Sequence, residues 1–215
     1  MTRRLAALAL TAVSLLLPAA SFAQEMAPDA LVRKSIDEVL VLIKADKDLQ
    51  NGNPKKLHAL VEEKILPHFD FTRMTRLAVG RSWSQASDAQ KQALTREFQS
   101  LLVRTYSTSI SQYRNQTIDV KPAKIAAGDK DTVVRTVVNQ PGGQPIPIDY
   151  SMERAEKGWK VYDVVVDGVS LVTTYRGSFN EQIQKSGVDG LVKTLADRNR
   201  SSEAPKAPVK VDLKQ

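Results

Sequence analysis

Apolar residues recur every three or four positions over the first half of the chain, and this period predicts helices. Residues 30–45 show the spacing, and Asp29 can cap the first turn of the predicted helix. A second helix is expected to begin at Pro54, because proline suits the first helical position, and to end at Pro67. A third, short helix is expected over residues 71–80.

The longest helical pattern begins after Ser87 and reaches Tyr113. Ser87 and Gln90 have the spacing of a capping box, in which each side chain bonds the backbone N–H of the other residue. We therefore expect one long helix in the middle of the chain, with a well-defined start.

The period then changes from 3.6 to 2, which indicates strands. Three runs of this kind, 133–138, 146–153 and 159–166, are separated by short turns that contain glycine, and a weaker run over 118–125 precedes them. Consecutive strands joined by short turns predict an antiparallel meander. Because 133–138 is apolar at most of its positions, we expect both faces of that strand to be covered.

Helical spacing returns after residue 168, with apolar residues four positions apart at Leu171, Tyr175, Phe179 and Ile183. A last short helix is expected to carry Val188, Leu191 and Leu195. Helices, then a meander, then helices predict an α+β fold, in which a curved antiparallel sheet of about four strands packs against N- and C-terminal helices. We expect a single domain over residues 24–198 and a flexible C-terminal tail over 199–215, which is rich in Lys, Pro and Ser.

The first 23 residues have the parts of a cleaved signal peptide. Arg3 and Arg4 precede an apolar run over residues 5–17, and small residues stand at Ser21 and Ala23. The run is too short to cross a hydrocarbon core of roughly 30 Å, which takes about 20 residues. We expect cleavage after Ala23 and export to the periplasm, with a twin-arginine signal as the alternative to an ordinary secretory one.

The residue types exclude several kinds of chemistry. The chain has no cysteine, so it has no disulfide, thiolate metal site or cysteine nucleophile. Its two histidines, His58 and His68, lack the spacing of metal ligands, and no glycine-rich phosphate loop is present, so we expect no metal and no cofactor. Asp149 and Asp163 are the carboxylates that could perform acid–base chemistry if either is buried.

The formal net charge is +7, but the basic residues are scattered along the chain. We therefore expect no nucleic-acid partner. The charge fits either a weak attraction to anionic membranes or an ordinary solvated surface. Arg135, which stands among valines, could lie near a phosphate group of a ligand or pair with a carboxylate.

Three segments, in order, resemble the MlaC family of periplasmic phospholipid-binding proteins, which is also described as toluene-tolerance or ABC-transporter auxiliary components. They are LPHFDF at 66–71 with Met74, LAVG at 77–80 and Trp83; WKVYDV at 159–164, VDGVSL at 166–171 and VTTYR at 172–176 with Phe179; and GVDGL at 187–191. The resemblance extends over essentially the whole chain after the predicted signal peptide.

The resemblance implies a cone like that of nuclear-transport-factor proteins, closed by helices around an apolar cavity. It also implies a monomer that carries phospholipid between an outer-membrane lipoprotein–porin complex and an inner-membrane ABC transporter with an MCE-domain protein, and so maintains outer-membrane lipid asymmetry. The phospholipid is cargo, and no catalytic group is needed. A diacyl lipid has about 30 methylenes at ~0.8 kcal/mol each, so its transit through water needs a carrier.

We expect the cavity to be lined by apolar residues from both kinds of element. From the helices these are Phe71, Met74, Leu101, Leu102, Tyr106 and Ile110, and from the sheet and the returning helix Val137, Ile148, Tyr150, Val164, Val166, Val169, Leu171 and Tyr175. The same stripes are equally typical of an ordinary packed core. Two other functions remain open: a small-molecule enzyme on a related cone that uses Asp149 or Asp163, and a periplasmic carrier of lipoproteins or unfolded peptides.

Overall fold

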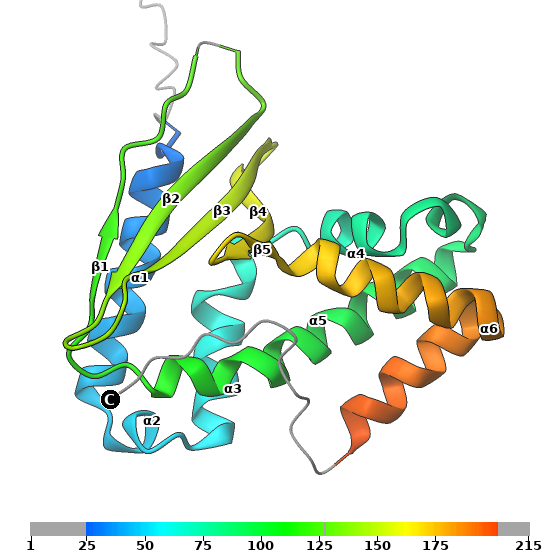
Figure 1. The fold of residues 1–215 in the computed structure, drawn as a ribbon, viewed down its shortest axis with the longest axis horizontal. Coiled ribbons are helices and arrows are strands. Elements are labelled where there is room, and N and C mark those ends of the chain that lie inside the picture. Colours follow the sequence, from blue (N-terminus) through cyan, green and yellow to red (C-terminus); the bar gives the residue numbers. More distant parts are fainter. Residues whose placement is uncertain (1–24, 127, 202–215) are drawn as a thin grey trace, which may run out of the picture.

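The computed structural model describes residues 25–126 and 128–201, and Figure 1 shows the arrangement of its helices and strands. The predicted signal peptide and most of the predicted tail lie outside the described residues. The architecture is α+β, as the order of the periodic segments predicts. Among the described helices, none is long and apolar enough to cross a membrane.

Helices make up the first part of the described chain. In order they are α1 (Pro28–Ala45), α2 (Lys47–Gln50), α3 (Pro54–Lys64), the 3-10 turn η1 (Leu66–His68), α4 (Phe71–Val79), the 3-10 segment η2 (Gly80–Gln85) and α5 (Asp88–Ser111). Ser87 forms the expected capping box, because its hydroxyl accepts the N–H of Gln90 and its own N–H bonds the Gln90 side chain. The short α2 and η2 carry no clear sequence period.

Five antiparallel strands then form one sheet in sequence order: β1 (Thr117–Val120), β2 (Asp131–Asn139), β3 (Ile146–Ala155), β4 (Gly158–Val166) and the two-residue β5 (Val169–Ser170). The three long strands are the predicted meander. β1 is shorter than the predicted run over 118–125, and β5 exists only because the chain turns back at Gly168 with a positive φ of 78°.

The two faces of the sheet differ in their surroundings. Val134, Tyr150 and Val164 lie directly opposite one another on β2, β3 and β4 and point to the inner face, toward the helices. On β2 the alternate residues, among them Val133 and Arg135, are exposed. The expectation that both faces of β2 are covered is therefore wrong, because no described element packs against the outer face of that strand.

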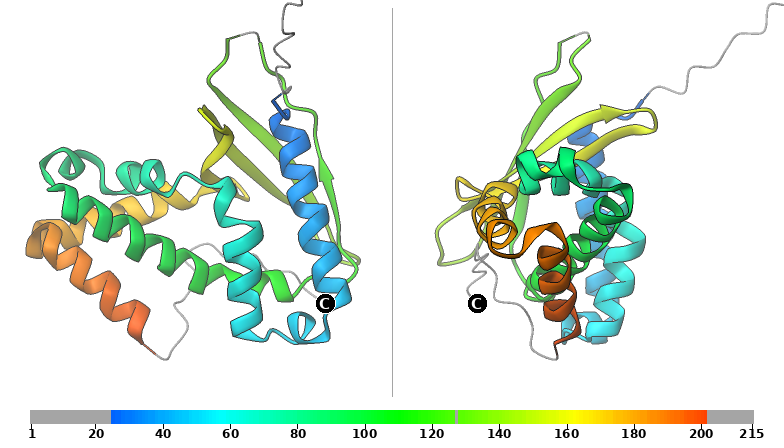
Figure 2. Two further views of the ribbon diagram at one scale, coloured as in Figure 1. Left: turned by 180° about the vertical axis from the view of Figure 1, so that it is seen from behind. Right: turned by 90° about the vertical axis from the view of Figure 1, so that its right-hand side faces the viewer.

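The last helix, α6 (Leu171–Arg200), bends at Gly187, whose φ of 70° and ψ of −177° are not helical. The bend divides α6 into the two helices that the sequence predicts. Figures 1 and 2 show that the sheet with α1 lies at one end of the molecule and that α4, α5 and α6 pack together at the other, with α3 between them.

The largest cluster of buried apolar residues in the described part of the chain lies between α4, α5 and α6. Phe98 of α5 is fully buried there, and its ring meets the rings of Tyr175 and Phe179 edge-on, with centroids 5.0 Å apart in both pairs. We call this cluster the helical core; its buried members are Met74, Ala78, Val79, Leu94, Phe98, Leu101, Leu102, Val172, Tyr175, Phe179, Leu191 and Leu195. The other end of the molecule is built differently.

Candidate functional site

A cavity of about 360 Å³ lies between the inner face of the sheet and the helices α1, α3 and α5. Its wall is apolar apart from a few hydroxyl groups and one imidazole. The sheet contributes Ile118, Ile148, Tyr150, Met152, Val161, Val164 and Val166 to this wall. A volume in the range of ~300–1,000 Å³ is typical of sites that hold small organic ligands.

Several large apolar side chains in this wall are only half-buried, although they point inward. Phe71, Tyr106, Ile148 and Val164 are of this kind. In the helical core, by contrast, Phe98 has no exposed surface. Apolar side chains that point inward stay partly exposed where they border a cavity, because no other side chain packs against them there.

Most of the residues expected from the sequence to line a cavity lie in its wall. They are Phe71, Met74, Leu102, Tyr106, Ile110, Ile148, Tyr150, Val164, Val166 and Leu171. The fold brings them together because the inward face of β3 and β4 meets the inward face of α4 and α5.

Four of the expected residues lie elsewhere. Leu101 of α5 and Tyr175 of α6 are buried in the helical core, because both side chains point into the packed region between α4, α5 and α6. Val137 lies opposite Pro147 and so shares the outer face of the sheet with Val133 and Arg135. Val169 is 46% exposed at the turn before α6.

One side of the wall was not expected from the sequence. It comes from α1, α3 and the η1 region, and its apolar members are Leu31, Val32, Ile36, Val39, Leu40, Val61, Ile65, Leu66 and Phe69. The apolar stripes of α1 and α3 are visible in the sequence, but a stripe does not reveal whether it faces a core or a cavity.

Two ionisable side chains in the wall, Tyr150 and His68, have pKa values shifted in the direction that favours their neutral forms. Burial raises the pKa of Tyr150 to about 12, although a hydrogen bond with Thr136 acts in the opposite direction. Burial, followed by the nearby Lys160 ammonium, lowers the pKa of His68 below its usual 6.5. Near pH 7 both side chains are therefore uncharged.

The two carboxylates considered for catalysis do not line the cavity. Asp149 lies on the outer face opposite Arg135, with 3.9 Å between the Arg135 Nε and its carboxylate. Of the two roles considered for Arg135, the structure therefore has the pairing with a carboxylate. Asp163 fixes the start of α6, because it accepts the N–H of Val172 at 3.1 Å and the hydroxyl of Ser170 at 2.5 Å.

Arg73 fastens α4 to the sheet at one edge of the cavity. Its guanidinium pairs with Glu153 and, at 2.8 Å, with Asp131, and its Cζ lies 3.6 Å from the centre of the Tyr162 ring. Tyr162 is the extra residue of a β-bulge in β4, since Ser151 and Met152 pair with Asp163 and Val161. Burial raises the pKa of Glu153, against the effect of Arg73. We call this group the Arg73 clamp.

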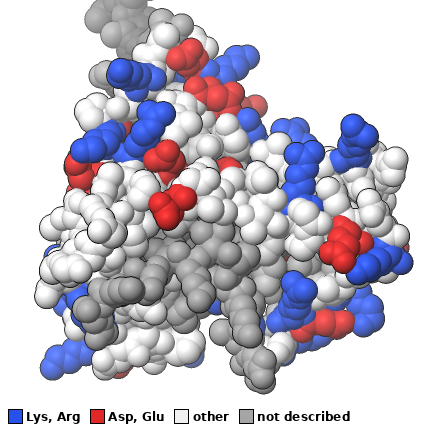
Figure 3. All heavy atoms as spheres, in the orientation of Figure 1, with Lys and Arg blue, Asp and Glu red and all other residues white. Residues whose placement is uncertain are grey.

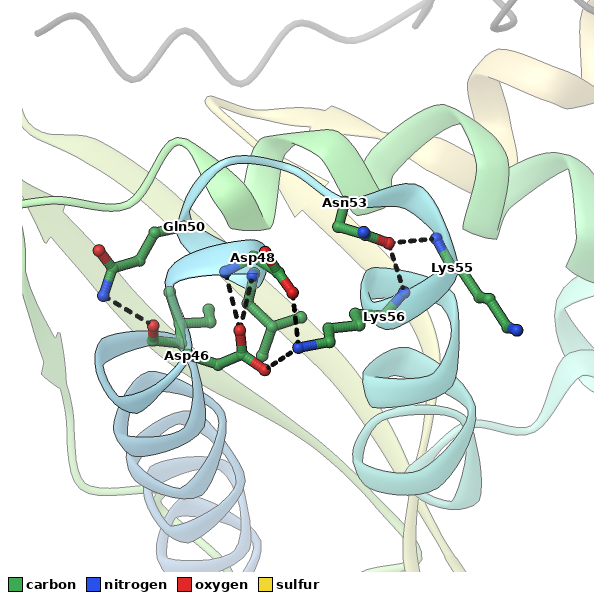
Figure 4. A network of polar contacts seen from close by, with 8 residues as sticks. Asp46, Asp48, Gln50, Asn53, Lys55 and Lys56 are labelled. Atoms are coloured by element: carbon green, nitrogen blue, oxygen red, sulfur yellow. Dashed lines mark hydrogen bonds and ion pairs between the residues drawn. The ribbon is translucent and has the colours of Figure 1, made fainter.

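A second group of polar side chains connects α1 and α3, two of the helices that line the cavity. Figure 4 shows the Lys56 ammonium of α3 between two carboxylates of the α1–α2 junction, Asp46 at 2.7 Å and Asp48 at 2.8 Å. The Asp46 carboxylate also caps α2, and Asn53 caps α3. This group, the Lys56 bridge, holds α1 and α3 side by side.

Charged side chains of both signs are interspersed on the face of the molecule in Figure 3, without one dominant basic area. Within residues 25–126 and 128–201, no group of three or more His, Asp or Glu side chains is placed to hold a metal ion. Fold and site together define a class of protein: a helix-covered antiparallel sheet with an apolar cavity between the sheet and the helices.

Comparison with known proteins identifies the family. The family model described as MlaC protein matches residues 33–197, and the chain belongs to the MlaC family. It is 28% identical to the toluene tolerance protein Ttg2D of Pseudomonas putida over 169 residues, 78% of each chain. It is 24% identical to the intermembrane phospholipid transport system binding protein MlaC of Haemophilus influenzae over 174 residues, 80% of this chain and 81% of that one.

A solved structure is also similar. It is a phospholipid-binding protein from Ralstonia solanacearum in complex with a phospholipid, with a TM-score of 0.74 and 46% sequence identity, covering 80% of this chain and 96% of that one. The fold and family that the sequence motifs predict are thus confirmed.

Proposed function

We propose that this protein is a periplasmic phospholipid carrier that holds acyl chains in the apolar cavity. The observation that carries the proposal is the cavity itself, whose apolar wall extends over the sheet and six helical segments, α1, α3, η1, α4, α5 and the start of α6. The similar Ralstonia protein, solved with a phospholipid, supports the same ligand class.

The energetics favour such a carrier. Exposure of about 30 methylenes to water costs more than roughly 20 kcal/mol at ~0.8 kcal/mol each. Transfer of the same chains from a bilayer to an apolar cavity is nearly neutral, because both surroundings are apolar. The protein therefore has to supply an apolar interior, and no reacting group is required.

We further propose that the carrier exchanges lipid with an outer-membrane lipoprotein–porin complex and with the MCE-domain protein of an inner-membrane ABC transporter. The carrier acts as a monomer in this proposal, and its activity maintains the lipid asymmetry of the outer membrane. The similarity to the Haemophilus relative, the binding protein of an intermembrane phospholipid transport system, supports this part of the proposal.

The test is the lipid content of the purified protein. Native mass spectrometry is expected to show a mass excess of one or more phospholipids, which an organic extract then identifies. A bound acylated or unfolded peptide in place of diacyl lipid would instead support a lipoprotein or peptide carrier. Protein without any lipid after gentle purification would contradict the proposal.

A matched pair of variants tests whether the lipid is bound in the cavity. Val164→Glu puts a carboxylate into the wall, whereas Val133→Glu puts one on the exposed outer face of β2. We expect Val164→Glu to abolish lipid loading while the protein stays folded by circular dichroism, and Val133→Glu to load as the parent does. Equal loading of both variants would place the lipid somewhere else.

A further inference from the structure

A second pocket, of about 550 Å³, adjoins the apolar cavity on the other side of η1. It lies between α3, α5 and the end of the β3–β4 hairpin. Leu66, Phe69 and Phe71 line both spaces, and the rings of Phe69 and Phe71 stack with centroids 5.6 Å apart. A ligand at this boundary can therefore contact an apolar space on one side and the second pocket on the other.

The second pocket has the polar groups that the cavity lacks. Its charged side chains are Lys160, Glu62 and Asp70, and Thr72, Thr95 and Gln99 supply neutral polar groups. The Lys160 ammonium donates to the backbone carbonyl of Pro67, so it is held against η1 at the edge shared with the cavity. The pocket thus combines one cation with two carboxylates.

The two carboxylates are held differently. One Asp70 oxygen accepts the N–H of Arg73 at 2.8 Å and caps α4. Glu62 is on the solvent side of α3, and one of its carboxylate oxygens is 3.4 Å from His58 Nδ1. The Asp70 side chain also interacts with that of Glu153, whose pKa it raises. Because a carboxylate can accept several hydrogen bonds, both Glu62 and Asp70 can accept a further donor.

We propose that this second pocket holds the headgroup of the bound phospholipid and favours a zwitterionic phosphoethanolamine over an anionic phosphoglycerol. The inference rests on the proposed carrier function, because it assigns the polar end of the same ligand. The phosphate lies near Lys160, the ammonium faces Glu62 and Asp70, and the glycerol lies at the Leu66–Phe69–Phe71 boundary.

The signs of the charges carry the preference. The ammonium of phosphoethanolamine is attracted by the two carboxylates. The glycerol of phosphoglycerol is neutral, so the two carboxylates gain no cationic partner from that headgroup. Charges some 6 Å apart that are surrounded by water with its bulk dielectric constant interact weakly, and the resulting preference is roughly threefold.

The experiment loads lipid-depleted protein from vesicles that contain equal amounts of phosphatidylethanolamine and phosphatidylglycerol with matched acyl chains. The lipids bound to the re-isolated protein are then counted by mass spectrometry. We expect roughly three molecules of phosphatidylethanolamine for each phosphatidylglycerol in the parent.

Two variants on α3 make the matched comparison. Glu62→Lys reverses a charge in the pocket, and Glu63→Lys makes the same charge change at the next residue, which lies outside the pocket and pairs with Lys64. Glu62→Lys is expected to remove or invert the preference, and Glu63→Lys to keep it. Both side chains are largely exposed, so neither substitution disturbs a packed interior.

The outcomes separate this proposal from the carrier function. Equal loading of the two lipids by the parent, or the same ratio in Glu62→Lys and Glu63→Lys, would overturn the headgroup site and leave the carrier intact. A parent that takes up neither lipid would overturn the carrier function itself.

Discussion

The helical core and the cavity are built from similar side chains, yet one is filled and the other is hollow. In the helical core, three aromatic rings meet edge to face or tilted around Phe98 with no exposed surface on that residue. In the cavity, Phe71 and Tyr150 also point inward, but a space of about 360 Å³ separates them from the opposite wall. The comparison indicates that the helical core supplies stability, while the cavity gives up part of its packing in order to hold a ligand.

A pair of phenylalanine substitutions gives the largest expected effect. Phe98→Ala opens a void in the filled region and is expected to lower the free energy of unfolding by about 3–5 kcal/mol. Phe71→Ala mainly enlarges a space that is already present, although it also removes the stack on the Phe69 ring, and about 1–2 kcal/mol is expected. Urea denaturation of the lipid-free proteins measures both values. Equal losses of unfolding free energy would show that the two regions do not differ in packing as described.

The Arg73 clamp joins the two regions, because it connects α4 of the helical core to the sheet of the cavity. Arg73→Leu keeps much of the side-chain volume but removes the bonds to Asp131 and Glu153 and the contact with the Tyr162 ring. We expect a loss of about 2 kcal/mol in unfolding free energy, since two carboxylates lose a charged donor. Arg76→Leu, at an exposed position of the same helix, is the control, and an equal loss there would mean that the clamp contributes nothing specific.

The Lys56 bridge is expected to have the smallest effect, since exposed ion pairs contribute little. The hydrogen bond from Lys56 is the main reason that the pKa of Asp46 lies below its usual 3.8, and Lys56→Gln should raise it toward that value. Because the pKa is lowered in the folded protein, this carboxylate stabilises the fold above pH 3.8, and the contribution is lost as the pH falls through the folded value.

Carboxyl chemical shifts measured by NMR through an acid titration test this prediction directly. The small difference in denaturation midpoint between the parent and Lys56→Gln should also shrink at high salt. An Asp46 titration that is the same in both proteins would show that the bridge does not form in solution.

Much of the fold could be predicted because its signals are local. The Ser87 capping box, the glycine turns of the meander and the change of period each depend on a few neighbouring residues, and each is present in the structure. The bend of α6 at Gly187 separates the two helical patterns that the sequence shows. By contrast, α2 and η2 are too short to show a period.

The wall of the cavity could be predicted only in part, because a period defines one face of an element and not what lies opposite. Leu101 and Leu102 are neighbours in the sequence, but only Leu102 lines the cavity, although both are buried. The spacing of Tyr175 predicts a side chain that faces the cavity, but its ring packs against Phe98 in the helical core. Which stripe faces an open space depends on how α1 packs against the sheet and how α3 packs against α1 and α5. That packing involves contacts such as the bond from Arg33 to Val120, 87 residues apart.

The protonation of His68 and Tyr150 has a consequence for cargo exchange. Desolvation lowers the pKa of the His68 imidazole and raises the pKa of the Tyr150 phenol, because it disfavours the charged form of each. Both side chains are therefore neutral around pH 7. Around neutral pH, hydrocarbon can therefore enter and leave without meeting a charge on either of these two side chains.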